Sequence, residues 1–152
     1  MKKALLFLCL MLVPAMAVAD EIDQYMELLR SDLRTTKVEI LTTELKMTDV
    51  QAEKFWPIQR AYETELATIQ DARLTMIKDY AKNYSLMNDA VAKSLTDRAF
   101  KIQEQRTALL KKTTGKVSKE VSPMVAARFA QVEAFIQSLF DLKVRGEVPV
   151  VP

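Results

Sequence analysis

The sequence predicts an all-α protein. Glycine occurs only twice in 152 residues, so the chain has few of the residues that usually form turns between short strands. Apolar residues recur at spacings of three and four, which is the period of an amphipathic helix. The alternation of apolar and polar residues that is typical of strands is missing until the last few residues. Four helices account for this pattern.

The first two helices are predicted from an apolar stripe and a start signal. Helix one runs from about residue 21 to 45, with the stripe Ile22, Tyr25, Met26, Leu29, Leu33, Ile40, Leu41 and Leu45. Helix two begins after Thr48, because Thr48 and Gln51 have the spacing of a capping box. It reaches about Tyr84, and we expect a kink at Pro57, since proline removes one helical hydrogen bond.

The last two helices also carry start signals. Asn88 is the expected N-cap of helix three, from about Asp89 to Val121, and Ser122 that of helix four, with Pro123 in the first turn. Helix four is expected to stop at Gly146. Residues 147–152 then form an extended apolar tail, either frayed or packed into a helix groove, because two prolines forbid a regular strand.

The N-terminus has the layout of a secretory signal peptide. Lys2 and Lys3 precede an apolar run, and Ala17-Val18-Ala19 is a small-x-small cleavage site. The run is too short for a membrane anchor, which needs about 20 apolar residues. We expect residues 1–19 to be removed between Ala19 and Asp20, which leaves one helical domain over residues 20–146 and no membrane span. Export implies a periplasmic location.

Charge is balanced overall but not locally. Lys2 and Lys3 are the whole excess of 22 basic over 20 acidic residues, so the mature net charge is zero and nucleic acid is not an expected partner. Basic residues gather in helix three, where five lie within about 60° of one another at about 100° per residue and flank the apolar stripe of Leu95, Ile102 and Leu109. This basic row is Arg98, Lys101, Lys112, Lys116 and Lys119.

Two interpretations of the basic row remain open. It is either a protein-binding face that attracts acidic segments, or it pairs, within or across subunits, with acids of helix one, namely Glu27, Asp32, Glu39 and Glu44. A plain solvated face is the simplest alternative to both.

The residue inventory argues against an enzyme. The chain has no histidine, and its one cysteine, Cys9, leaves with the signal peptide. Triads that use histidine are therefore excluded, and zinc or copper sites lack their usual ligands. Two glycines are too few for a phosphate-binding loop. We expect no catalytic residue, no metal and no cofactor.

A family resemblance enters at the helix starts. Met47-Thr48-Asp49-Val50-Gln51 resembles the L-T-x-x-Q motif of the Spy/CpxP family of periplasmic proteins, with Met in place of Leu. Its second copy aligns with Met87-Asn88-Asp89-Ala90-Val91, where Asn replaces Thr and Val replaces Gln. The segments 53–58 and 126–133 also look like an uncharacterised branch of this group, so the resemblance covers most of the mature chain.

The resemblance implies a fold and two functions. Spy-like members are four-helix proteins that pair as curved, antiparallel dimers and hold unfolded proteins without ATP, so we expect an antiparallel, hairpin-like bundle with a kinked second helix. CpxP-like members restrain an inner-membrane sensor kinase. A third branch binds zinc and is linked to metal stress, which the absence of histidine and mature cysteine makes a poor fit here.

We therefore expect a periplasmic holding chaperone or envelope-stress protein that binds unfolded or stress-damaged proteins. The alternative is a regulator or sensor subunit that binds one partner, such as a sensor kinase. A homodimer is expected in either case, because helices one and four are apolar over arcs that four helices of unequal length rarely cover alone.

Overall fold

A computed structural model describes residue 24 and residues 36–150 of the chain. Residues 36–44 are helical and are followed by α2 (Asp49–Asn83), the short 3-10 helix η1 (Tyr84–Leu86), α3 (Asp89–Glu120) and α4 (Pro123–Glu147). No strand occurs in this part of the chain. The predicted all-α class is confirmed. The predicted signal peptide and most of the N-terminal half of predicted helix one lie outside the described residues.

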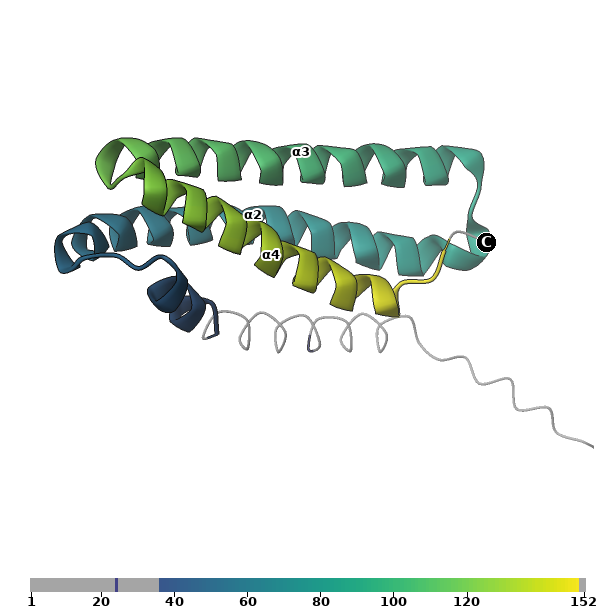
Figure 1. Ribbon diagram of the computed structural model, residues 1–152. Coiled ribbons are helices and arrows are strands. Elements are labelled where there is room, and N and C mark those ends of the chain that lie inside the picture. Colours follow the sequence, from purple (N-terminus) through teal and green to yellow (C-terminus); the bar gives the residue numbers. More distant parts are fainter. Residues whose placement is uncertain (1–23, 25–35, 151–152) are drawn as a thin grey trace, which may run out of the picture.

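The three long helices lie side by side, and the chain reverses direction at residues 84–88 and again at 121–122 (Figure 1). Helix α3 packs on both α2 and α4. The helix continues through Pro57 without a break, although proline has no N–H to donate to the carbonyl of Glu53.

Side-chain caps set where the helices begin. Thr48 Oγ1 accepts a hydrogen bond from the Gln51 backbone N–H at 3.3 Å, and Gln51 Oε1 accepts one from the Thr48 N–H at 3.1 Å. Asn88 Oδ1 accepts from two backbone N–H groups of α3, and Ser122 Oγ accepts from that of Val125. Each cap satisfies donors that have no partner inside the helix.

Replacing Thr48 with Ala should lower the free energy of unfolding by about 1 kcal/mol. The change removes one acceptor at the start of α2 and leaves the packing of the core alone. The matched control is Thr64→Ala, because the Thr64 hydroxyl bonds to the Arg60 carbonyl inside the helix and alanine has the higher helix propensity there. Urea unfolding of both variants measures the difference; equal losses would contradict a capping role.

The end of α4 differs from the prediction. Gly146 lies inside the helix, which continues to Glu147, and no described glycine has a positive φ. The helix stops instead at Val148, whose backbone is extended with φ −108° and ψ 110°. Because Pro149 follows, its ring disfavours the helical conformation of Val148. Proline therefore ends this helix, and the extended tail begins one residue later than predicted.

The main core is built around an aromatic group that joins α2 to α4. The Phe129 ring lies edge-on to Phe55 and Tyr62, with centroids 5.7 and 5.5 Å apart. Leu41 and Leu45 of the first helix and Val117 of α3 are fully buried against it. A smaller apolar cluster at the other end joins Phe140 and Val144 of α4 to Leu74 and Ile77 of α2.

The first helix is also tied to α4 through its last turn. Arg128 Nη1 donates a hydrogen bond of 3.0 Å to the carbonyl of Leu45, one of the carbonyls at the end of a helix that lack a partner. Lys46 then takes a left-handed conformation with φ 47°, which turns the chain toward α2.

Candidate functional site

The predicted capping residues Thr48, Gln51, Asn88 and Ser122 all lie at helix starts, and their polar atoms bond to the backbone of their own helices. They are spread over three separate helix ends. They therefore do not form one site.

The basic row is partly occupied by ion pairs with α2. Arg98 lies 2.7 Å from Asp79, and Lys112 lies 2.9 Å from Glu65. Lys101, Lys116 and Lys119 are exposed and have no ion pair with any described residue. Three of the five predicted residues are thus free to meet an acidic partner.

The alternative pairing with helix one is not seen within the described part of a single subunit, and pairing across subunits stays a prediction. Glu39 and Glu44 are exposed and form no ion pair in the described part of the chain. Glu27 and Asp32 lie outside the described residues. The acids that pair with the basic row come from α2, because α2 and α3 are packed along their length.

The apolar stripe beside the basic row is also not a surface. Ile102 and Leu109 are buried in the core, and Leu95 is half-buried. A client cannot reach them without separating the helices. The apolar surface of a binding site must therefore lie elsewhere.

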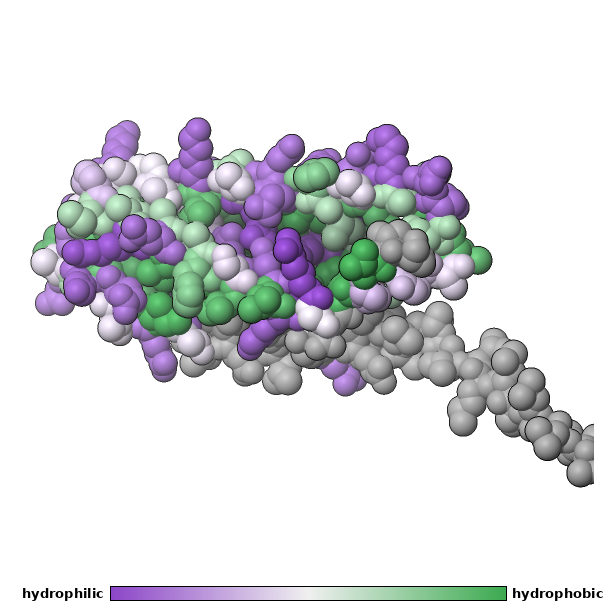
Figure 2. All heavy atoms as spheres, turned by 45° about the vertical axis from the view of Figure 1, so that its right-hand side comes forward, coloured by the Kyte–Doolittle hydropathy of each residue, from purple (hydrophilic) through white to green (hydrophobic). Residues whose placement is uncertain are grey.

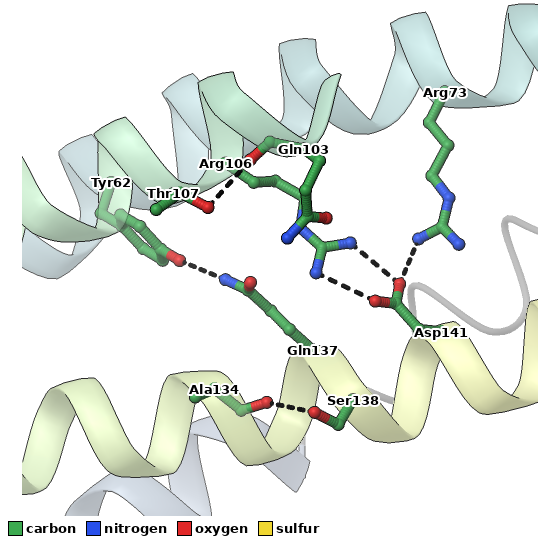
Figure 3. A network of polar contacts seen from close by, with 9 residues as sticks. All are labelled: Tyr62, Arg73, Gln103, Arg106, Thr107, Ala134, Gln137, Ser138 and Asp141. Atoms are coloured by element: carbon green, nitrogen blue, oxygen red, sulfur yellow. Dashed lines mark hydrogen bonds and ion pairs between the residues drawn. The ribbon is translucent and has the colours of Figure 1, made fainter. Parts of the chain in front are cut away.

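A buried polar cluster, which the sequence did not predict, connects the first helix to α2 and α4. It consists of Lys37, Tyr62, Glu63, Glu133 and Gln137. The Lys37 ammonium lies 2.5 Å from Glu133 Oε1 and 2.6 Å from Glu63 Oε1. The Tyr62 hydroxyl donates to Glu133 Oε2 at 3.0 Å and accepts from Gln137 at 2.9 Å (Figure 3 shows the latter bond).

The carboxyl of Glu133 is the most deeply placed charge in this cluster, since Glu133 is 0% exposed. Burial raises its pKa above the ordinary value, while the Lys37 ammonium and the Tyr62 hydroxyl oppose that rise. Burial, followed by the charge of Glu133, raises the pKa of Tyr62 as well. Tyr62 therefore stays protonated and remains a donor to Glu133.

A second cluster joins α2, α3 and α4. Arg106 makes two hydrogen bonds to Asp141, at 2.8 and 3.0 Å, and Arg73 adds a third at 2.5 Å (Figure 3). Burial alone raises the pKa of Asp141, but the hydrogen bonds and charges of Arg106 and Arg73 outweigh it and hold that pKa below its ordinary value.

A cavity of about 60 Å³ separates the two clusters, and both contribute to its lining. It is large enough to hold water. Every carboxylate in the clusters is paired with a cation, so none is free to act as a general base. These charges hold the helices in register.

Comparisons with protein-family models, with curated proteins and with solved structures gave no match. In the described part of the chain, no group of three or more His, Cys, Asp or Glu side chains is placed to hold a metal ion. None of the described helices is long and apolar enough to cross a membrane.

The outer side of α4 carries a row of exposed apolar side chains. Phe135, Leu139 and Leu142 are 59%, 39% and 70% exposed, and their spacings of four and three place them on one side of the helix. Glu133, Phe140 and Val144 occupy the opposite, buried side. Hydrophobic residues also reach the surface between hydrophilic ones on the face shown in Figure 2. The α4 apolar row is therefore the best candidate for contact with another protein.

Proposed function

We propose that the protein is a periplasmic, ATP-independent holding chaperone that binds unfolded or stress-damaged proteins as a homodimer of hairpin-like bundles. The observation that carries the proposal is the α4 apolar row, because three large apolar side chains in line are open to solvent on a helix whose other side is anchored in the core. The resemblance to Spy-like proteins agrees with it.

The row suits weak and unselective binding. Burying one Phe or Leu side chain contributes about 1.5–3 kcal/mol, so contacts with one or two side chains are reversible and need no ATP for release. Apolar contacts are non-directional, and many client sequences satisfy them equally. Lys101, Lys116 and Lys119 add attraction for acidic clients over a distance of about 8 Å at physiological salt.

The double substitution Phe135→Ser with Leu142→Ser tests this proposal. We expect at least about a tenfold loss in the suppression of aggregation of a denatured acidic protein, measured by light scattering, because the loss of even one of the two apolar contacts exceeds about 1.4 kcal/mol. The melting temperature should change little, since both side chains are more than half exposed.

The matched control is Val50→Ser with Leu86→Ser. These two side chains are 64% and 74% exposed and belong to elements other than α4, since Val50 lies at the start of α2 and Leu86 at the end of η1. The control should keep full activity. If both double variants lose activity equally, exposed apolar area in general is responsible and the row has no special role.

The molecular mass in solution separates the remaining alternatives. The wild-type protein and both variants should be dimers by light scattering at micromolar concentration. Dissociation of the Phe135→Ser, Leu142→Ser variant would assign the row to the subunit interface and overturn its role in client binding. Wild-type protein that suppresses no aggregation but retains one partner in fixed stoichiometry would support the regulator that binds a sensor kinase.

A further inference from the structure

The C-terminal tail, residues Val148–Val150, is held against the protein. It leaves the end of α4 and crosses to the end of α2, where the chain turns toward α3 (Figure 1). Three contacts hold it there: the packing of one apolar side chain and two hydrogen bonds to its backbone. The described part of the tail, residues 148–150, is therefore packed against the helices, and residues 151–152 lie outside the described part of the chain.

The apolar contact comes from Val148. It packs against Phe140 and Val144 of α4 and against Leu74 and Ile77 of α2. These four side chains lie outside the main core, toward the C-terminal ends of α2 and α4. They form an apolar contact surface on which one aliphatic side chain, that of Val148, packs.

The backbone contacts come from two tyrosines. The Tyr80 hydroxyl donates to the carbonyl of Pro149 at 2.8 Å, and the Tyr84 hydroxyl donates to the carbonyl of Val150 at 3.4 Å. The two rings lie edge-on to each other, with centroids 5.7 Å apart. Donors spaced by one turn of helix thus meet successive carbonyls of an extended chain.

These contacts recognise the backbone of the tail more than its side chains. Val150 is 86% exposed, Pro149 is exposed, and both are held only through their carbonyl oxygens. Proline keeps a segment extended and has no N–H to satisfy. Aromatic grooves that donate to the carbonyls of such segments are a general mode of peptide recognition.

We propose that Leu74, Ile77, Tyr80, Tyr84, Phe140 and Val144 form a binding groove for extended, apolar, proline-containing segments of other proteins, and that the tail is its internal occupant. A segment of the same chemistry binds by displacing the tail. The tail thereby excludes ligands that bind weakly or are dilute, because a covalently attached occupant has a high effective concentration. This groove does not depend on the proposed chaperone activity and lies apart from the α4 apolar row.

The probe is the acetylated peptide Val-Pro-Val-Val-Pro, which has the sequence of residues 148–152, added to isotope-labelled full-length protein and followed by NMR. The ring signals of Tyr80 and Tyr84 should shift, and the tail signals should move to new positions as the tail is displaced. In the full-length variant Val148→Asp, which expels the tail, the peptide should bind with a Kd on the order of 1 mM and about tenfold more tightly than in the wild type.

Two controls make the result decisive. The peptide Asp-Pro-Val-Val-Pro lacks the aliphatic anchor and should cause no shift. Tyr80→Phe, introduced into the Val148→Asp variant, should weaken peptide binding about fivefold with no change in melting, since it removes one hydrogen bond and no packing.

Absence of peptide binding to a folded Val148→Asp variant would overturn the proposal and leave the tail as a structural element. If that variant does not fold, the wild-type titration decides alone. The apparent Kd expected for the wild type is about 10 mM, so about half of the tail should be displaced at that peptide concentration, and tail signals that stay unmoved there contradict displacement. No client is present in this experiment, so its failure is distinct from failure of the chaperone proposal.

Discussion

Replacing Lys37 with Met should lower the free energy of unfolding by about 3–5 kcal/mol. The substitution keeps the aliphatic volume but leaves the Glu133 carboxylate, which is 0% exposed, without its cation. A buried charge without a partner costs far more than the pair itself contributes. Thermal melting should show a fall of about 10–20 °C.

The matched control is Glu133→Gln. It removes the buried charge and leaves Lys37 paired with Glu63 at 2.6 Å, on the half-exposed side of the cluster. Because burial already disfavours the charged form of Glu133, the loss should be clearly smaller than for Lys37→Met. Equal losses of stability in the two variants would show that the attraction between Lys37 and Glu133 itself stabilises the fold. They would contradict the view that an unpaired buried charge is the main cost of Lys37→Met.

The pH dependence gives a second test of Lys37→Met. Without the ammonium, burial and the neighbouring Glu63 raise the pKa of Glu133 further above its ordinary value of 4.5. The native variant then takes up a proton at a higher pH than the unfolded chain does, so its stability relative to wild type should recover as pH falls through that raised pKa. A deficit that stays constant between pH 7 and about pH 5 would contradict this account.

Replacing Asp141 with Asn should lower the free energy of unfolding by about 3 kcal/mol, at the lower end for a buried pair because Asp141 keeps a quarter of its side chain exposed. The Arg73 and Arg106 side chains are 14% and 11% exposed, and they would face each other without a shared anion. The control is Asp97→Asn, which breaks an exposed pair with Lys93 and should cost at most about 0.5 kcal/mol.

The sign of the pH effect is opposite here. The pKa of Asp141 lies below its ordinary value of 3.8 in the folded protein, so its contribution is complete above that ordinary value and is lost as pH falls through the lowered pKa. The difference between wild type and Asp141→Asn should therefore be constant at neutral pH and shrink in acid. Urea titrations at a series of pH values measure it; a difference that grows in acid would contradict the ion-pair cluster.

Local signals in the sequence were enough to predict where the long described helices begin. The starts of α2, α3 and α4 follow from Thr48, Asn88 and Ser122, because a cap is an interaction between a side chain and backbone groups two or three residues away. The end of α4 was misplaced because two local signals compete there. Pro149 acts on the residue before it whatever its surroundings, whereas glycine permits a left-handed C-cap without requiring one.

The polar clusters had no such local signal. Tyr62 and Glu133 are 71 residues apart, and Arg73 and Asp141 are 68 apart. On a helical stripe, Glu133 looks like any solvated acid. Glu133 lies on the same side of α4 as the buried residues Phe129, Ile136 and Phe140. A single polar residue within such an apolar stripe is the one sequence pattern that marks Glu133 as a core position.

The sequence alone was enough to predict that this chain is helical and where α2, α3 and α4 begin, and it shows that histidine is absent and that Cys9 is the one cysteine, because those properties depend on residue type and on neighbours within a turn. Only the tertiary structure decided that the stripe of α3 is core, that α4 exposes Phe135, Leu139 and Leu142, and that the tail reaches Tyr80. Which side of an apolar helix meets solvent depends on how the helices cross, and that is fixed by contacts between distant residues.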